Sequence, residues 1–347
     1  MIKKLKSRQN KSEFPSELRL DLVSKDWVVI ATGRARKPET FRREKKISEE
    51  FSHKNCPFCR DEILKDVTSA FSNGRKVRFQ DLKNWTTISA RNKFPAFLPS
   101  PKLEKTVEGN LYQAMNAVGF HEIVITRNHR RSLALLSLAR VKEVIDVYQE
   151  RFLDLMEEPL VRHVSIFHNH GSEAGASIYH PHSQIVTTPL IDVDLLRALS
   201  NSENYFKTKK KCVYCEMDKW EKKVKKRIVF ENRDFLVLCP FASKSAFEVI
   251  ISPKKHLPYF EKITEKEKWQ LAEAFKAALS KIFKALNDPA YNFYLHTAPC
   301  DGKNYDHYHW HWTILPKTSV WAGFEIGTRM EISTIEPEKA AEYLRKH

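Results

Sequence analysis

The sequence has no apolar run that approaches the length of a membrane-spanning helix. Its N-terminal stretch, MIKKLKSRQNKSEF, is basic and lacks the apolar core of a secretory signal peptide. These two absences argue against a membrane protein and against an exported one. We therefore expect a cytoplasmic protein with no membrane partner, in which residues 1–17 form a flexible basic tail.

Acidic residues are scarce relative to basic ones. The chain has 43 Asp and Glu against 59 Lys and Arg, which gives a formal net charge of +16. Such an excess occurs in nucleic-acid-binding proteins, but a protein that binds phosphate esters shows it as well. The lysines are spread along the chain and cluster only partly, at residues 3–11, 206–211 and 222–227. We therefore predict no nucleic-acid partner.

Cysteine is also infrequent, and its placement argues against a disulfide framework. Four of the six cysteines form two CxxC pairs, Cys56/Cys59 and Cys212/Cys215. In a chain without an export signal, this spacing favours zinc over disulfides. A tetrahedral zinc site needs two further ligands for each pair. Cys239 and Cys300 stand alone and are expected to be ordinary core or surface residues.

A length of 347 residues is sufficient for two domains, and the chain repeats one pattern of elements. In the first copy, a strand at residues 121–126 leads to His129. A helix follows, with apolar residues on one face, starting at Ser137 and stopping before Pro159. A further strand and a glycine-containing loop then reach His180.

The second copy has the same order. A strand at residues 247–252 leads to His256, and Thr264 begins a helix in which Glu267 completes a capping box. The helix stops before Pro289, and a strand and a polar loop then reach His309. From the stopping proline to the first paired histidine the distance is 21 residues in one copy and 20 in the other. The sequence therefore contains an internal duplication.

The duplication predicts two Cys₂His₂ metal sites, because each copy supplies a CxxC pair, a histidine before its helix and a histidine on its last strand. Zn²⁺ accepts such tetrahedral sets, and closed sites of this kind are structural. We predict one or two zinc ions per chain. His307 is an alternative to His309 in the second set. The predicted ligands are Cys56, Cys59, His129 and His180 in the first set, and Cys212, Cys215, His256 and His309 in the second.

The candidate catalytic stretch is residues 167–186, FHNHGSEAGASIYHPHSQIV. Its small polar residues suit a loop that lets a ligand approach the backbone. On a strand, residues two apart share a face, so His180 and His182 present two imidazoles side by side, while Pro181 suits only an edge or a strand start. If zinc holds His180, His182 is free to act as a nucleophile. The alternative is a pair of ordinary buried histidines, which the tandem spacing and the adjoining loop disfavour.

The segment His180-Pro-His-Ser-Gln184, preceded by Asn169-His-Gly171, resembles the active-site strand of the nucleotidyltransferase branch of the histidine-triad superfamily. This branch contains the galactose-1-phosphate uridylyltransferases and their nucleoside-phosphorylase relatives. The resemblance implies that His182 is the nucleophile and that Gln184 and Ser177 donate hydrogen bonds to the phosphoryl oxygens.

The fold expected from the repeat and the resemblance is α+β, with two duplicated half-domains whose antiparallel strands form one sheet flanked by helices. The N-terminal half-domain, residues 18–195, carries the His-Pro-His segment and the first zinc site. The C-terminal half-domain, residues 196–347, carries the second zinc site and a sugar-binding segment.

Further motifs resemble the substrate-binding segments of the same family. Residues 33–38, GRARKP, suit either a phosphate-binding loop or a solvated loop, and the resemblance favours nucleotide contacts. This chain has Arg36-Lys37 where the family has Lys-Arg, and Arg329 where it has glycine. Without the resemblance, residues 320–328 suggest a late strand with a turn. The substrate-binding residues implied are Arg34, Lys37, Asn92, Asn169, Gly171, Gly323, Phe324 and Glu325.

The resemblance implies a hexose-1-phosphate uridylyltransferase, which converts UDP-glucose and galactose 1-phosphate into glucose 1-phosphate and UDP-galactose through a uridylyl-histidine intermediate. The partners expected are a nucleoside diphosphate sugar, a sugar 1-phosphate and a second copy of the chain, because the resembling enzymes are dimers whose sites borrow residues from the partner. An adenylyl-transferring relative such as ADP-glucose phosphorylase is the alternative, and Ser183 is shared with that branch. A basic zinc protein that binds nucleic acid is the third interpretation, disfavoured because such modules use ligands within a short span.

Overall fold

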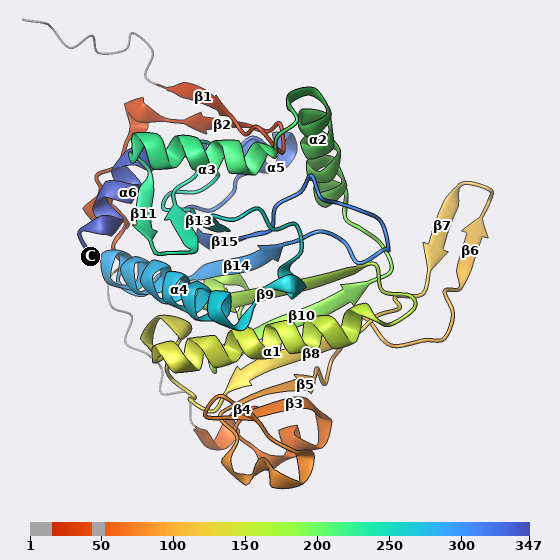
Figure 1. The fold of residues 1–347 in the computed structure, drawn as a ribbon. Coiled ribbons are helices and arrows are strands. Elements are labelled where there is room, and N and C mark those ends of the chain that lie inside the picture. Colours follow the sequence, from red (N-terminus) through yellow and green to blue (C-terminus); the bar gives the residue numbers. More distant parts are fainter. Residues whose placement is uncertain (1–15, 44–52) are drawn as a thin grey trace, which may run out of the picture.

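The computed structural model describes residues 16–43 and 53–347, and an antiparallel sheet of eleven strands runs through the described part. Its strand order is β11-β12-β13-β15-β14-β9-β10-β8-β5-β3-β4 (Figure 1). The N-terminal half contributes β3 (Val67–Ser72), β4 (Arg75–Lys76), β5 (Thr87–Arg91), β8 (His121–Thr126), β9 (His163–His170) and β10 (His182–Thr188). The C-terminal half contributes β11 (Ile228–Glu231), β12 (Phe235–Leu238), β13 (Val249–Pro253), β14 (Tyr291–His296) and β15 (His311–Pro316).

The sheet displays the duplication directly. Strands β9 and β14 pair with each other at its centre. Outward from this pair, the order is β9-β10-β8-β5-β3 on one side and β14-β15-β13-β12-β11 on the other. The predicted α+β fold, with two repeated halves in a shared antiparallel sheet, is confirmed.

Two long helices lie side by side on one face of this sheet (Figure 1). Helix α1 (Leu138–Met156) is capped by the Ser137 side chain, which accepts a hydrogen bond from the Arg140 N–H. Helix α4 (Glu265–Leu286) begins with the predicted capping box of Thr264 and Glu267. Each helix buries an apolar stripe against the sheet, so both helices predicted from periodicity and caps are present.

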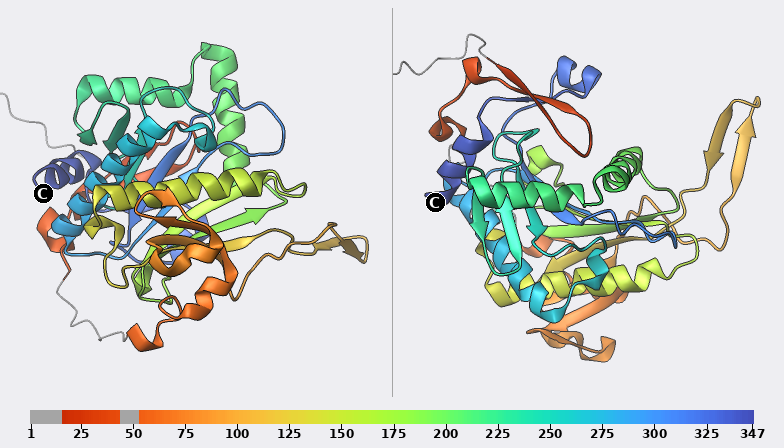
Figure 2. Two further views of the ribbon diagram at one scale, coloured as in Figure 1. Left: turned by 60° about the horizontal axis from the view of Figure 1, so that its bottom comes forward. Right: turned by 45° about the horizontal axis from the view of Figure 1, so that its top comes forward.

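The opposite face is covered in the C-terminal half by α2 (Val193–Lys209) and α3 (Val213–Val224), with a small sheet beside them (Figure 2). That sheet consists of β1 (Glu17–Leu20), β2 (Trp27–Ile30) and β16 (Ile332–Ser333), and β2 pairs with β16 in parallel. Helix α6 (Pro337–Arg345) follows β16. Residues 16–43, although they come first in the chain, therefore pack against the C-terminal half.

A hairpin of β6 (Lys105–Glu108) and β7 (Tyr112–Met115) projects away from the body of the molecule (Figures 1 and 2). All residues of both strands are exposed to solvent. Within the described residues, no helix combines the length and the apolar character needed to cross a bilayer.

The prediction of a late strand with a turn at residues 320–328 is wrong, because a short helix, α5 (Gly323–Thr328), occupies this segment. The Glu325 carboxylate accepts a hydrogen bond from the Ala322 N–H at 3.0 Å, which closes the first turn of the helix. Arg329 ends it in the left-handed conformation, with φ of 57°, where helices usually place glycine. Local capping chemistry therefore determined the structure of a segment whose hydrophobic pattern suggested a strand.

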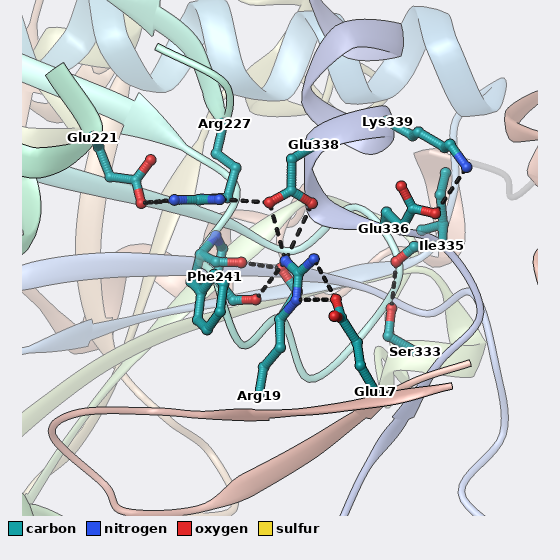
Figure 3. A network of polar contacts seen from close by, with 12 residues as sticks. Glu17, Arg19, Glu221, Arg227, Phe241, Ser333, Ile335, Glu336, Glu338 and Lys339 are labelled. Carbon is teal, nitrogen blue, oxygen red and sulfur yellow. Dashed lines mark hydrogen bonds and ion pairs between the residues drawn. The ribbon is translucent and has the colours of Figure 1, made fainter. Parts of the chain in front are cut away.

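A buried ionic network attaches β1 to the C-terminal half (Figure 3). The Glu338 carboxylate accepts hydrogen bonds from Arg19 at 3.1 Å and from Arg227 at 2.5 Å. Arg227 also pairs with Glu221 on α3, and both guanidinium groups lie against the Phe241 ring. The two arginine side chains are less than a tenth exposed. One carboxylate on α6 thus compensates two buried cations from distant parts of the chain.

Glu338→Ala is expected to lower the free energy of unfolding by on the order of 3 kcal/mol, because it leaves two buried guanidinium groups without their shared partner. Urea denaturation followed by circular dichroism measures this loss. Glu342→Ala on the same helix is the control, since its carboxylate pairs with Lys346 at the exposed surface and its loss is expected to leave the midpoint unchanged. Equal midpoints for the two variants would contradict the role given to Glu338.

Candidate active site and metal-binding groups

Strand β10 begins at His182, immediately after Pro181, as the proline requires. The Nδ1–H of His182 donates a hydrogen bond to the backbone carbonyl of His180 at 2.9 Å. A proton on Nδ1 leaves the lone pair of a neutral imidazole on Nε2. The structure therefore gives His182 the tautomer that a nucleophilic Nε2 needs, through a carbonyl group only two residues away.

The surroundings of His182 keep its ring neutral. The side chain is 8% exposed, and burial lowers its pKa, while the hydrogen bond to the His180 carbonyl acts in the opposite direction. The ring of Phe58, inside the first CxxC pair, packs edge-on against the His182 ring with centroids 4.9 Å apart. Phe58 was not predictable from the sequence, because an aromatic residue between two cysteines forms no distinctive pattern.

Gln184 lies two residues beyond His182 and therefore on the same face of β10. Its Oε1 lies 2.8 Å from Nε2 of His121 on β8. Nδ1 of the same ring accepts the backbone N–H of Ala96 at 3.1 Å, and Nδ2 of Asn92 lies 3.1 Å from its Nε2. The predicted residues Asn92 and Gln184 are thus brought together by a histidine that the sequence analysis missed.

Ser183 faces the opposite side of β10, toward α1. Its hydroxyl is buried and hydrogen-bonds Tyr148 of α1 and His168 of β9, the latter at 3.0 Å. Ser183 therefore links β10 to α1 and β9, and its side chain lies on the face of the sheet opposite to that of His182.

The predicted residue Asn169 lies near the end of β9, and Gly171 and Ser177 lie in the loop between β9 and His180. Asn169 Oδ1 accepts a hydrogen bond from Asn292 of β14 at 2.8 Å. Gly171 has φ of 80°, and an added Cβ would lie 2.8 Å from the Cβ of Ala290. The glycine is thus required by close packing on the second half, a reason independent of any ligand. Ser177 is exposed in this loop.

The four predicted ligands of the first metal set converge on one point. Cys56, Cys59, His129 and His180 each offer a ligand atom, and all four atoms lie within 4.8 Å of one another. The Cys59 sulfur is 3.2 Å from Nδ1 of His129 and 3.4 Å from Nδ1 of His180, and the Cys56 sulfur is 3.6 Å from the latter. Nε2–H of His180 donates to the Thr126 carbonyl at 2.7 Å, which turns Nδ1 toward the sulfurs.

The second set repeats this geometry with Cys212, Cys215, His256 and His309. The Cys215 sulfur lies 3.4 Å from Nδ1 of His256 and 3.6 Å from Nδ1 of His309. Nε2–H of His309 donates to the Pro253 carbonyl at 2.9 Å, at the end of β13, which corresponds to the end of β8 in the first half. The geometry groups His309, and not His307, with the cysteines.

These separations fit a tetrahedral ion. Zinc–sulfur and zinc–nitrogen bonds of about 2.3 and 2.0–2.1 Å imply sulfur–nitrogen edges of about 3.6 Å. The observed sulfur–nitrogen distances in the two sets run from 3.2 to 3.6 Å. Burial, together with the neighbouring Cys56, raises the pKa of Cys59 to about 12, so a cation is needed to stabilise the thiolate form.

The second half repeats the histidine pair, as His309 and His311, but has no glutamine at the position that corresponds to Gln184. Nδ1–H of His311 donates to the His309 carbonyl at 3.2 Å, as His182 does to His180. Thr313 stands where Gln184 stands in the first half, and the His311 ring stacks on His296 with centroids 4.5 Å apart. A cavity of about 1410 Å³ adjoins His311, whereas His182 does not line it.

The remaining predicted substrate residues lie elsewhere in the fold. Arg34 ends a short 3₁₀ turn after β2, and Lys37 precedes another. The backbone at residues 31–36 pairs with residues 333–334, close in sequence to α5 with Gly323, Phe324 and Glu325. Helix α5 lies near β1, β2 and α2, away from β10 (Figure 1). One chain therefore holds two separate groups of predicted substrate residues.

Comparison with known proteins agrees with this architecture. Residues 7–191 match the family "Galactose-1-phosphate uridyl transferase, N-terminal domain", and residues 198–346 match the corresponding C-terminal domain. ADP-glucose phosphorylase of Arabidopsis thaliana is 29% identical over 95% of this chain and 92% of its own length. Galactose-1-phosphate uridylyltransferase of Thermotoga maritima is 25% identical over 95% of this chain and 98% of its own.

The crystal structure of the Arabidopsis thaliana ADP-glucose phosphorylase with bound ADP-glucose superposes with a TM-score of 0.76 at 27% identity, covering 96% of this chain and 99% of that one. A uridylyltransferase structure superposes with a TM-score of 0.72 at 26% identity, covering 95% and 97%. The two family domains together cover nearly the whole sequence. The chain therefore belongs to the galactose-1-phosphate uridyl transferase family and is a nucleotidyltransferase.

Proposed function

We propose that this enzyme transfers a nucleotidyl group from a nucleoside diphosphate sugar through a covalent bond to Nε2 of His182. The observation that carries the proposal is the hydrogen bond from Nδ1–H of His182 to the His180 carbonyl, in a site where burial keeps the ring neutral. A neutral imidazole with a free, fixed Nε2 lone pair is a nucleophile suited to phosphorus.

The reaction proceeds in two displacements. Nε2 attacks the α-phosphorus, a phosphorus–nitrogen bond forms, and the bond to the bridging oxygen breaks to release the sugar 1-phosphate. A phosphate oxygen of the acceptor then attacks the same phosphorus and His182 leaves. Gln184 and Ser177 donate hydrogen bonds to the phosphoryl oxygens as their charge develops.

Two donors are compatible with this chemistry. UDP-glucose, with galactose 1-phosphate as acceptor, is the donor expected from the family to which both domains belong. ADP-glucose, with phosphate or another acceptor, is the second candidate. It is supported by the similarity to the Arabidopsis thaliana phosphorylase, which exceeds that to the Thermotoga maritima uridylyltransferase in identity.

Brief incubation with either donor in the absence of acceptor is expected to leave a nucleotide on His182, detected as an added mass on the intact protein at neutral or basic pH. A UMP-sized adduct identifies uridylyl transfer, and an AMP-sized adduct identifies the adenylyl reaction. His182→Ala removes the nucleophile and should form neither. Gln184→Ala should form the adduct more slowly, by on the order of a hundredfold.

His311 provides a matched control, because it repeats the Nδ1–H hydrogen bond of His182 in the second half. His311→Ala alters the corresponding histidine of the second half and is expected to leave adduct formation intact. Adduct formation by His182→Ala at the rate of the unaltered enzyme would refute the assignment of the nucleophile.

We also propose that the two Cys₂His₂ groups each hold a structural zinc ion. The support is the tetrahedral edge lengths and the carbonyl groups that orient His180 and His309. A bound zinc would keep both cysteines of each pair in the thiolate form, and the ion of the first group would fix the backbone around His180. No chemical step passes through either ion.

Metal analysis of the purified protein is expected to give about two zinc ions per chain, and Cys212→Ser should lower this to about one, with a lower thermal midpoint, because metal binding contributes folding free energy. Cys300→Ser, at a cysteine outside both groups, is the control and should keep both ions. Full zinc content in Cys212→Ser would exclude this group as a metal site.

We further propose that the active site is completed by a second copy of the chain. The support is the separation of α5 from β10 within one chain (Figure 1), together with the backbone hydrogen bonds that join residues 31–36, which include Arg34, to residues 333–334. In a symmetric dimer, Arg34 and helix α5 of one chain face His182 of the other. The phosphates then lie between cations of one subunit and the nucleophile of its partner.

Subunit mixing tests this arrangement. His182→Ala and Arg34→Ala, each impaired alone, are expected to recover up to about a quarter of the original activity after mixing and refolding, because half of the dimers are mixed and one of their two sites is intact. Mixing His182→Ala with Gln184→Ala is the control, because these two residues belong to the same site and no intact site forms. Absence of recovery in the first mixture would place the whole site within one chain.

A further inference from the structure

We propose that His121 is a positioning residue that presets the amide of Gln184 for the phosphoryl group. This inference rests on the proposed function, because it assigns the way in which the phosphoryl donor of that reaction is oriented. His121 opens β8 and lies diagonally across from Gln184, since the strand register pairs His121 with Val186 and Ile123 with Gln184.

The hydrogen bonds of His121 determine its tautomer. The backbone N–H of Ala96 can only donate, so Nδ1 of His121, 3.1 Å away, carries a lone pair. Nε2 of the neutral ring therefore carries the proton. It lies 2.8 Å from Oε1 of Gln184 and donates to that oxygen, so the Asn92 NH₂ group, 3.1 Å from the same nitrogen, is a neighbouring contact and not a hydrogen-bond donor to it.

This bond decides which end of the Gln184 amide faces the substrate. With Oε1 held by His121, the amide NH₂ group is turned away from the ring and stays available on the face that Gln184 shares with His182. A rotated amide would present its oxygen to the phosphoryl oxygens, and two acceptors of negative partial charge repel one another. His121 therefore excludes the unproductive rotamer before substrate arrives.

The same ring connects Gln184 to residues 92–96, the segment that contains the predicted substrate-binding residue Asn92. Besides the Ala96 bond, the backbone N–H of Asn92 donates to the His121 carbonyl at 2.8 Å. The Asn92 Oδ1 in turn accepts the N–H of Phe94 at 3.0 Å, which holds the segment in a turn. One imidazole thus contacts both this segment and the Gln184 amide.

Two substitutions separate the two ring nitrogens. His121→Gln places an amide NH₂ near the position of Nε2 and keeps the donor to Gln184. His121→Asn places its amide near the position of Nδ1 and cannot reach Gln184. A merely structural role, in which the ring only satisfies the exposed Ala96 N–H, predicts the opposite ranking of the two variants.

The measurement is the single-turnover rate of nucleotide transfer to His182, with the donor that labels the unaltered enzyme, followed by quenched flow and intact mass. His121→Asn is expected to lower the maximal rate by about ten- to a hundredfold while the half-saturating donor concentration changes much less. His121→Gln should recover most of the rate. In a Gln184→Ala background, His121→Asn should cause no further loss, because the two residues act as one unit.

Three results would overturn the inference: an unchanged rate in His121→Asn, equal losses in the Gln and Asn variants, or losses at His121 and Gln184 that multiply in the double variant. Thermal midpoints of all variants check the fold, and the Gln variant keeps the test open if the Asn variant is unstable. If the unaltered enzyme forms no adduct with either donor, the proposed function itself fails, and that result is distinct from any ranking among variants.

Discussion

The backbone carbonyl of His180 is the atom on which the rest of the candidate site depends. The same residue turns Nδ1 toward Cys56 and Cys59 and donates Nε2–H to the Thr126 carbonyl. Its position is therefore set by three contacts from two other parts of the chain. Because this carbonyl accepts a hydrogen bond from Nδ1–H of His182, the geometry of the cysteine–histidine group determines the orientation of His182, the proposed nucleophile. A structural metal at this group would influence catalysis by fixing a carbonyl, without touching substrate.

Comparison of the two halves separates the features of this site that both repeats share from those found in the first repeat. His309 and His311 repeat the carbonyl hydrogen bond, and His309 repeats the contact to a strand-end carbonyl. Burial lowers the pKa of His311 to about 4, so this ring also stays neutral. Its strand, however, carries Thr313 in place of Gln184, and the His296 ring stacks on the His311 ring. The cysteine–histidine group and the hydrogen bond that sets the tautomer are thus common to both repeats, whereas a glutamine two residues after the second histidine, the proposed phosphoryl donor Gln184, occurs in the first repeat and not in the second.

Much of this arrangement was predictable because it depends on local chemistry or on repetition. The caps at Ser137 and Thr264 are short-range signals, and both begin helices. The convergence of His129 with Cys59 was predictable for another reason, because both copies present a CxxC pair, a histidine before the helix and a histidine on the last strand in the same order. In contrast, the helix α5 and the pairing of β2 with β16 were not anticipated. The first depends on a cap in a segment with a strand-like pattern, and the second joins residues about three hundred positions apart, for which a single sequence carries no signal.

His121 shows why a site residue can escape a sequence pattern altogether. It opens the strand HEIVIT as a single histidine, and such residues are usually ordinary half-buried side chains. Its significance arises only from register, because pairing of β8 with β10 sets it diagonally opposite Gln184. A shift of one residue would move its ring to the helix-covered face, where Glu122 instead forms a buried ion pair with Arg151. His121 and Glu122 thus lie on opposite faces of β8 and have different roles. The ion pair of Glu122 with Arg151 fixes the strand on the face covered by α1, and the resulting register holds the His121 ring beside the Gln184 amide on the opposite face.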